Sequence, residues 1–207
     1  KGSEEFAIHI KGLELPAYDP RPVKAHGLGM VTSNIGGSHA LSYGTQEVFG
    51  LPTAVDRFTV EGKGKLTKFN QDRLTWGECC IWCTFPTRTE WHKPDLLTKI
   101  VAAATGIDFG GFDSALKIGE RVWNVEKAFN VREGFDRKHD TLPARFLKEP
   151  IPEGPSKGQK FELEPLLDEY YQARGWDVAT GLPTRGKLEE LGLKDIADEL
   201  ERMGRLR

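Results

Sequence analysis

The chain has 207 residues, of which 38% are hydrophobic and 29% are charged, so it has the profile of a soluble globular protein that can bury a core. Its formal net charge of −2 argues against a general nucleic-acid binder and against a protein that binds membrane surfaces by charge. The sequence shows neither a long apolar run nor a charged-then-apolar leader, and its three cysteines form no disulfide framework, so we expect a cytoplasmic protein.

The first residues, KGSEEFAIHI, lack a methionine and lead almost at once into a strand-like stretch. Such a start is typical of a segment of a longer polypeptide, or of a processed or tagged chain. We therefore expect that residues outside this sequence complete the function.

The N-terminal part predicts little helix. Residues 6–10 are apolar or alternating and predict a short strand. Three prolines follow, so residues 1–22 are predicted to form an extended entry arm. In VTSNIGGSHALSYG, residues 31–44, polar residues precede a double glycine, which predicts a loop whose backbone closely approaches another group.

The remainder predicts helices separated by one long loop. Residues 65–85 lack proline and contain one interior glycine, which predicts a helix that ends near Pro86. Apolar residues spaced by four, three and four positions predict the clearest helix, over 114–131, with Asp113 or Ser114 as its N-cap. Further helices are predicted over 94–104, 164–173 and, as one or two helices, 185–207. Four prolines and two glycines predict a proline-rich loop over 140–160. The predicted fold class is mainly α, with a small β element near the N-terminus.

All three cysteines lie in the segment ECCIWCTF, residues 78–85. On a continuous helix, Cys79 and Cys83 would share a face, as would Cys80 and Cys83. Three interpretations remain open. A structural zinc site needs four ligands, and the nearby candidate for a fourth is His92, at a spacing that fits no common zinc pattern. Alternatively the thiols pack as small buried hydrophobes beside the tryptophans. In the third, one cysteine binds an iron–sulfur cluster whose other thiolates lie outside the sequence.

Several long sequence segments favour the third interpretation. GERVWNVEKAFNVREGFDRKHDTLPARFLKEPIPEGPSKGQ (119–159) and LLDEYYQARGWDVATGLPTRGKLEELGL (166–193) strongly resemble the C-terminal region of the tungsten-containing aldehyde ferredoxin oxidoreductase family. FAIHIKGLELPAYDPRP (6–22) and TSNIGGSHA (32–40) resemble the same family, so the likeness extends from about Phe6 to about Leu193. The resemblance implies a multihelical C-terminal domain of that type, which would occupy residues 1–207.

The resemblance also implies cofactors and ligands. In that family two pterin dithiolenes hold a tungsten or molybdenum ion, and a 4Fe-4S cluster lies beside one pterin. The family motif Asp-x-x-Gly-Leu-Cys-x-Phe places the fourth cluster ligand on Cys83 and the pterin contacts on Glu78 and Trp82. Three positions depart from the motif: Glu78 replaces Asp, Ile81 replaces Gly and Trp82 replaces Leu. Cys79 and Cys80 are then expected to be packed. The other three cluster cysteines and the cofactor-cradling N-terminal β domain are absent from this sequence.

The histidines divide into one candidate and four others. The resemblance places His39 near the metal, where an imidazole could donate a hydrogen bond or move a proton during aldehyde oxidation. The alternative for His39 is a loop histidine that satisfies local backbone groups. His9 is expected to be structural, and the other three to be solvated: His26, His92 and His139. A basic residue that relatives often carry two positions after His39 is Leu41 here.

Two functions follow. In the first, the chain is the C-terminal part of a tungsten or molybdenum pterin, iron–sulfur oxidoreductase that oxidises aldehydes to carboxylic acids and passes electrons to ferredoxin. Its partners would be ferredoxin and the missing N-terminal and middle domains, and a homodimer is compatible with the resemblance. In the second, the departures at Leu41, Glu78, Ile81 and Trp82 mark a degenerate site in a cofactor-free structural or docking domain.

Overall fold

The computed structural model describes residues 2–3, 6–89 and 95–206 of the chain. It is mainly helical, as predicted, with a small two-stranded sheet near the N-terminus. The elements in chain order are β1 (His9–Ile10), β2 (Leu13–Glu14), α1 (Lys24–Thr32), the 3₁₀ helix η2 (Ala40–Ser42), α2 (Thr45–Val48), α3 (Lys63–Cys79), α4 (Thr84–Thr89), α5 (Asp95–Thr105), α6 (Phe112–Arg132), the 3₁₀ helix η4 (Arg137–His139), α7 (Ala144–Lys148), α8 (Leu163–Arg174), α9 (Arg185–Glu190) and α10 (Lys194–Arg202).

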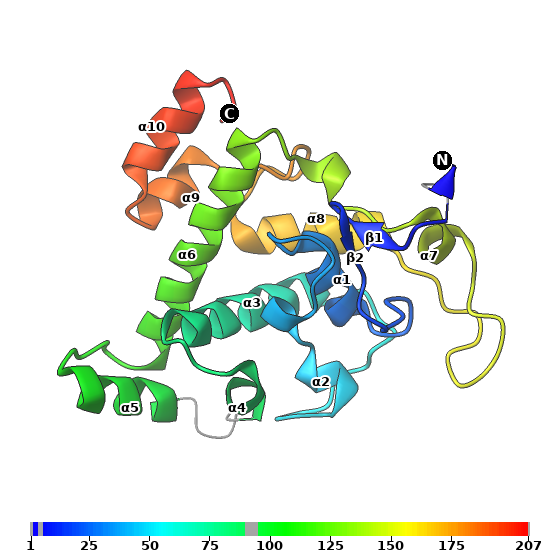
Figure 1. Ribbon diagram of the computed structural model, residues 1–207, viewed down its shortest axis with the longest axis horizontal. Coiled ribbons are helices and arrows are strands. Elements are labelled where there is room, and N and C mark those ends of the chain that lie inside the picture. The colour runs from blue at the N-terminus through cyan, green and yellow to red at the C-terminus, as the bar shows by residue number, and fades with distance from the viewer. Residues whose placement is uncertain (1, 4–5, 90–94, 207) are drawn as a thin grey trace.

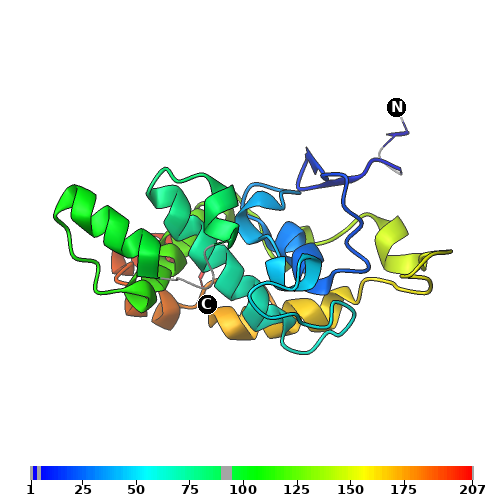
Figure 2. The same cartoon turned by 90° about the horizontal axis from the view of Figure 1, so that it is seen from below.

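Helix α3 runs through the middle of the molecule (Figures 1 and 2). It packs against α6, α8 and α1, and these four helices surround the main core. The strands β1 and β2 pair antiparallel, with His9 opposite Glu14, and form a short hairpin at the edge of this group. Large apolar side chains from these four helices are fully buried in the core: Leu28, Met30, Leu74, Trp123, Leu166, Leu167, Tyr170 and Tyr171.

Two glycines allow the central helices to approach closely. A Cβ atom on Gly119 of α6 would lie 1.9 Å from the backbone oxygen of Asp72 on α3. A Cβ atom on Gly64 of α3 would lie 2.5 Å from the backbone of α8 at Tyr170. Because any side chain at these two positions would push backbone away from backbone, the glycines set the separation of the three helices.

Arg174 of α8 lies at the point where these helices meet, and its side chain is fully buried. Its guanidinium forms an ion pair with Asp72 at 2.5 Å and donates to the amide oxygen of Gln71 at 2.7 Å and to the Tyr170 hydroxyl at 3.1 Å. The same group lies 5.3 Å from the ring centroid of Trp123 on α6. One buried cation therefore joins α8 to α3 through hydrogen bonds and to α6 through a cation–π contact.

A second buried charge cluster fastens the N-terminal hairpin to the core. Asp140 pairs with Lys11 at 2.6 Å and with Lys127 of α6 at 3.4 Å, and it accepts a hydrogen bond from the Tyr171 hydroxyl at 2.5 Å. Lys11 also donates to the backbone oxygen of Val31, at the C-terminal end of α1. Burial alone would raise the pKa of Asp140, but the two ammonium groups outweigh it and hold that pKa below its usual range.

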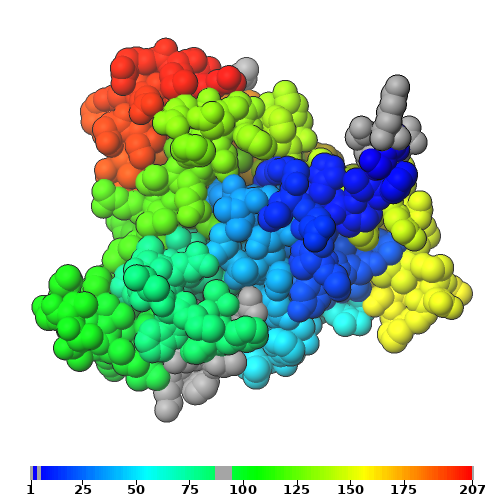
Figure 3. Space-filling model, in the orientation of Figure 1, coloured from blue at the N-terminus to red at the C-terminus, as the bar shows by residue number. Residues whose placement is uncertain are grey.

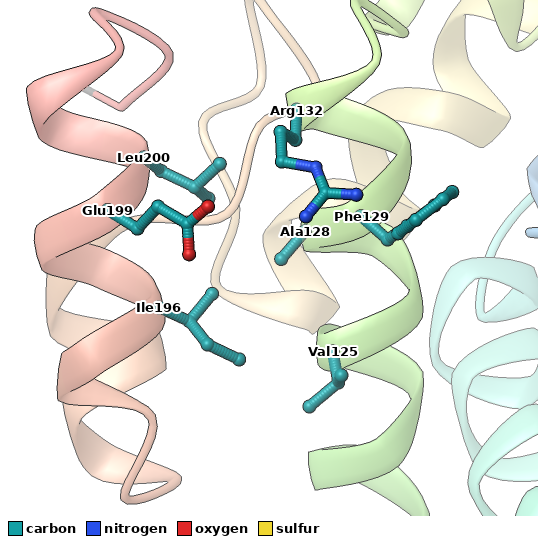
Figure 4. A pocket seen from close by; sticks show the side chains of 7 residues that line it. All are labelled: Val125, Ala128, Phe129, Arg132, Ile196, Glu199 and Leu200. Atoms are coloured by element: carbon teal, nitrogen blue, oxygen red, sulfur yellow. The ribbon is translucent and has the colours of Figure 1, made fainter.

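A smaller core joins the C-terminal half of α6 to α9 and α10, through Ala128, Val131, Leu188, Leu191, Leu193, Ala197 and Leu200. A shallow groove follows this seam, with an apolar floor and with Arg132 and Glu199 facing each other at one end (Figure 4). The groove lies on the opposite side of the molecule from α4 in the view of Figure 1.

Several predicted elements match the structure closely, and others do not. The helices predicted over 94–104, 114–131 and 164–173 correspond to α5, α6 and α8, and 185–207 contains two helices. Asp113 and Ser114 lie inside α6, so the predicted N-cap was wrong, and Gly111 precedes the helix. Five residues of the predicted loop 140–160 form α7.

Helix α1 was not predicted. All nine of its residues are buried, so no polar face reveals a helical period, and two glycines weaken the helical signal. Across the described part of the chain, no helix combines the length and the apolar character needed to span a bilayer.

We expect that Asp72→Ala destabilises the protein by about 3–5 kcal/mol, because it leaves the buried Arg174 without its carboxylate. Urea denaturation followed by circular dichroism measures the change. The matched control is Asp198→Ala, which removes an exposed carboxylate that pairs with Arg185 and Lys194 and should barely move the midpoint. Equal shifts in the two variants would contradict a central role for the Asp72–Arg174 pair.

Candidate cofactor-binding site

Helix α3 ends in a Schellman motif formed by the cysteine segment. The backbone N–H of Ile81 donates to the oxygen of Glu78 at 2.8 Å, and the N–H of Trp82 donates to the oxygen of Gly77 at 3.0 Å. This hydrogen-bond pattern requires a left-handed residue at its turn, and Ile81 has a φ of 55°. Glycine usually fills that position because a β-branched side chain is strained there.

The predicted helix over 65–85 was therefore wrong at its C-terminal end. Helix α3 ends at Cys79, and a separate helix, α4, begins at Thr84. The chain continues helically through Pro86 because proline is tolerated in the first turn of a helix, where backbone N–H groups lack intrahelical acceptors. Cys79 and Cys83 consequently do not share one helical face, since the turn at Ile81 separates them.

The three thiols differ in exposure. Cys79 and Cys83 are exposed, whereas Cys80 is half-buried and packs in a small cluster with Trp76, Leu97 and Trp82. The packing interpretation thus describes Cys80 but was wrong for Cys79. His92, the proposed fourth zinc ligand, lies outside the described residues. Among the residues that the structure describes, no three His, Cys, Asp or Glu side chains are grouped so that they could hold a metal ion.

Glu78 lies beside an acidic residue of the neighbouring helix. Partial burial raises the pKa of Glu78, and the carboxylate of Glu126 on α6 raises it further. The pKa of Cys79 is raised by burial and then by Glu126 and Glu78. At the end of α3, the carboxyl groups of Glu78 and of Glu126 on α6 therefore repel each other next to a thiol. A cation or a neutral hydrogen-bonding group would therefore bind more favourably beside Glu78 than an anion would.

Trp82 presents an unsatisfied donor. Its indole N–H is buried and has no hydrogen-bond acceptor among the described residues. A buried donor left unpaired costs about 1–3 kcal/mol, so an acceptor supplied from outside the chain would be favourable. The residue stays half-buried against Cys80 and Trp76.

His39 lies apart from that turn, within a group of four rings. Its ring centroid is 5.0 Å from that of Tyr18, 5.7 Å from that of Tyr43 and 6.0 Å from that of His26. His39 is half-buried, and Tyr18, from the entry arm, is partly exposed beside it. The structure thus brings Glu78, Trp82 and Cys83 into one turn and places His39 in a second group of side chains.

His26 was predicted to be solvated, and this was wrong, because its side chain is fully buried in α1. Its position is fixed by Glu47, whose carboxylate accepts the backbone N–H groups of Ala25 and His26, each at 3.0 Å. The same carboxylate pairs with Lys63 at 2.7 Å. Glu47 therefore caps the N-terminus of α1 from a distant part of the sequence. His139, also predicted to be solvated, is half-buried beside Asp136.

The loop that carries His39 and the cysteine turn (residues 78–83) are both linked to Glu126 of α6, the first by a hydrogen bond and the second by charge. Asn34, five residues before His39, donates to the Glu126 carboxylate at 3.1 Å and to the backbone oxygen of Trp123 at 3.3 Å. Glu126 is the residue whose charge raises the pKa of Glu78. The surfaces of the two segments adjoin in Figure 3, where the green-cyan end of α3 meets the blue surface of the loop.

Sequence reasoning did not select Tyr18, Tyr43, Glu47 or Glu126. Tyr18 and Tyr43 have no motif around them. Glu47 binds the backbone of His26, 21 positions away in the sequence, and Glu126 affects Glu78 from a different helix. The double glycine of the loop was the available signal. Gly36 and Gly37 do approach other backbone closely, because a Cβ atom on each would lie about 3 Å from backbone oxygens of the hairpin.

Comparison with known proteins agrees with this architecture. A family model described as "Aldehyde ferredoxin oxidoreductase, domains 2 & 3" matches residues 1–193. The chain is 42% identical over 201 residues to the tungsten-containing aldehyde ferredoxin oxidoreductases of Thermococcus kodakarensis and of Pyrococcus furiosus, and each match covers 94% of this chain and 32% of the relative. It also resembles a solved structure, the active site complex BamBC of benzoyl coenzyme A reductase in complex with 1,5-dienoyl-CoA. That likeness has a TM-score of 0.60 and 26% identity, and it covers 75% of this chain and 22% of the other.

The fold is thus that of an oxidoreductase family. The chain belongs to the aldehyde ferredoxin oxidoreductase family, as the sequence predicted, and corresponds to a C-terminal part of its enzymes. It spans about a third of the length of the curated relatives that it matches.

The described residues fit the cofactors that the family implies. The Cys83 thiol is exposed, so it can reach a group outside the chain, and the buried indole N–H of Trp82 has no acceptor within the described parts of the chain. At the position where the motif of the resemblance has glycine, Ile81 adopts the left-handed conformation that glycine favours. Replacement of glycine by isoleucine therefore changes the surface of the turn and leaves its hydrogen bonds in place.

We expect that Ile81→Gly stabilises the chain by about 0.5–1 kcal/mol, because it removes the left-handed strain at a cost in unfolded-state entropy. The side chain of Ile81 is 97% exposed, so little packing is lost. Urea denaturation measures the effect. The matched control is Ile107→Gly, at an exposed isoleucine without a positive φ, which should destabilise. A destabilised Ile81→Gly variant would show that the turn carries no strain.

We expect that Glu126→Gln lowers the pKa of Cys79, because it removes the second cause of the raised value while the amide oxygen can still accept from Asn34. The pH dependence of alkylation by iodoacetamide measures this in a chain with serine at positions 80 and 83. The control is Glu133→Gln, which removes an exposed carboxylate at the end of the same helix. An alkylation midpoint that does not fall in Glu126→Gln would place Glu126 too far from the thiol.

Proposed function

We propose that the chain is the C-terminal part of a tungsten pterin, iron–sulfur enzyme that oxidises aldehydes to carboxylic acids with ferredoxin as the electron acceptor, with molybdenum as the alternative metal. The proposal rests on the similarity to tungsten-containing aldehyde ferredoxin oxidoreductases and on the exposed thiol of Cys83 at the end of α3. The remaining cofactor ligands would come from polypeptide outside this chain.

Aldehyde oxidation sets the chemical requirements of the site. The reaction adds the oxygen of one water to the carbonyl carbon and releases a carboxylate, two electrons and three protons. The bound metal–pterin group and the cluster would supply the redox chemistry. The residues of this chain would orient those groups and handle protons.

Each candidate residue has a defined part in the proposal. Cys83 would give its thiolate to the 4Fe-4S cluster, as the fourth ligand. Trp82 would donate its buried indole N–H, and Glu78 would accept a hydrogen bond, at the edge of a pterin. His39 would hold or release a proton at an imidazole nitrogen, a role that suits a group titrating near neutral pH.

The exposed surface beside Cys83 suits the partners in the proposal. Ile81 and Phe85 are 97% and 70% exposed, and they flank the thiol. Large exposed apolar side chains at one site are typical of surfaces that another protein segment covers. We assign this surface to the N-terminal and middle domains of the same enzyme, with ferredoxin as the transient partner and a homodimer as a compatible assembly.

We expect that Cys83→Ser lowers the iron and acid-labile sulfide of the anaerobically purified full-length protein without unfolding it, because the cluster loses one thiolate. Cys79→Ser is the matched control, since it removes another exposed thiol from the same turn and should retain iron. Metal analysis and visible absorption are the measurements.

Two other outcomes would contradict parts of this proposal. Unchanged iron in Cys83→Ser would remove Cys83 from the ligands. A colourless wild-type protein without iron, tungsten or molybdenum would support the alternative, a cofactor-free structural or docking domain, for which the substitutions at Leu41, Ile81 and Trp82 would be the signs of a degenerate site.

A further inference from the structure

A second histidine, His26, lies next to His39 on its buried side. His26 is fully buried in α1, whereas His39 is half-buried in the loop before η2, and their ring centroids are 6.0 Å apart. Tyr43 lies against both rings, at 4.8 Å from His26 and 5.7 Å from His39, and Tyr18 lies at 5.3 Å and 5.0 Å. The two imidazoles and two phenols thus form one compact group, which joins the entry arm, α1 and the η2 segment.

The backbone fixes the protonation of the inner ring. The N–H of Gly44 donates to Nδ1 of His26 at 3.3 Å. A nitrogen that accepts a hydrogen bond carries no proton, so neutral His26 has its hydrogen on Nε2. Protonation of Nδ1 would break this bond and turn two donors toward each other. The two segments approach each other closely, because a Cβ atom on Gly44 would lie 3.3 Å from Cβ of His26.

The charged groups beside His26 are already balanced. Glu47 accepts the backbone N–H groups of Ala25 and His26 and pairs with Lys63 at 2.7 Å. Its negative charge is therefore compensated by an ammonium group and by the N-terminus of α1. A charge on the buried His26 would also lie close to a charge on His39. Burial of His26 and its Gly44 hydrogen bond favour His39 as the ring that takes up a proton, and the mutual repulsion disfavours a charge on both rings at once.

We propose that His26 is the positioning residue of His39: it accepts the Gly44 N–H, holds residues 39–44 in place, and stays neutral so that His39 carries the exchangeable proton of the pair. The geometry of the pair stands on the structure alone, while its use in aldehyde oxidation rests on the proposed function. In that reaction the proton released near the substrate would be taken up at a nitrogen of His39. His26, on the buried side of His39, would fix the orientation of that ring.

The first test is the tautomer of each ring in the ¹⁵N-labelled 207-residue chain. Long-range ¹H–¹⁵N correlation spectra from about pH 5.5 to about pH 8.5 span the range in which histidine titrates. We expect His26 to keep a proton on Nε2 and none on Nδ1 throughout, while His39 changes from protonated to neutral. A His26 that titrates together with His39, or that carries its proton on Nδ1, overturns the proposal.

The second test replaces His26. His26→Phe keeps a ring but removes the acceptor, and we expect it to shift the titration midpoint of His39 by about 0.5 pH unit or more. His26→Asn supplies an amide oxygen near the position of Nδ1 and should restore most of the midpoint. The matched control is His9→Phe: Nδ1 of His9 also accepts a backbone N–H, from Gly12 at 3.4 Å, but His9 is exposed on the hairpin and should not affect His39.

Folding of each variant is checked by its amide spectrum. An unchanged His39 midpoint in a folded His26→Phe overturns the proposal. If that variant does not fold, the tautomer of wild-type His26 and the His26→Asn variant decide. A folded His26→Asn in which the titration midpoint of His39 moves from its wild-type value to that of an unfolded chain also overturns the proposal. These measurements need no metal, so their failure is distinct from a loss of the iron that tests Cys83.

Discussion

The buried ion pair between Arg174 and Asp72 is the constraint on which the rest of the fold depends. A guanidinium without access to water is tolerated only where carboxylate, amide and hydroxyl oxygens surround it, and Asp72, Gln71 and Tyr170 provide them. These partners lie on α3 and α8, so the pair sets the register of one helix against the other. Gly119 then allows α6 to cross α3 at Asp72 itself. Because Cys79 ends α3, the same register determines where the cysteine turn meets α6.

The candidate site combines two groups of side chains that this framework supports in different ways. The cysteine turn is held by local backbone hydrogen bonds and is exposed, with a strained isoleucine at its tip. The His39 group is held by long-range contacts, through the pair of Glu47 with Lys63 and through the hydrogen bond from Asn34 to Glu126 of α6. An exposed thiol suits a ligand that meets a group outside the chain. A ring enclosed by other rings suits a proton carrier, whose orientation must be fixed.

Ile81 illustrates how a turn that favours glycine can form around a β-branched residue. The turn keeps both Schellman hydrogen bonds, although the side chain at its centre disfavours the conformation. Strain of this kind persists where the surrounding structure determines the backbone. Here the packing of Trp76, Cys80 and Trp82 on either side of the turn provides that determination. The departure from the motif therefore alters the surface of the turn more than its path.

The sequence by itself determined the family, the mainly helical class and those helices whose apolar residues follow a clear period, such as α6 and α8, because an amphipathic face is written directly in the residue order. Through the resemblance it also selected Cys83, Glu78, Trp82 and His39 as candidate site residues. Only the tertiary structure decided the end of α3, since an isoleucine does not signal a left-handed turn, and the existence of α1, since a helix buried on all sides has no polar face. The partners of His39 likewise emerged only from the fold, because Tyr18, His26 and Tyr43 come from three separate segments of the sequence, two of which are joined by the hydrogen bonds that Glu47 accepts from α1 and that Gly44 donates to His26.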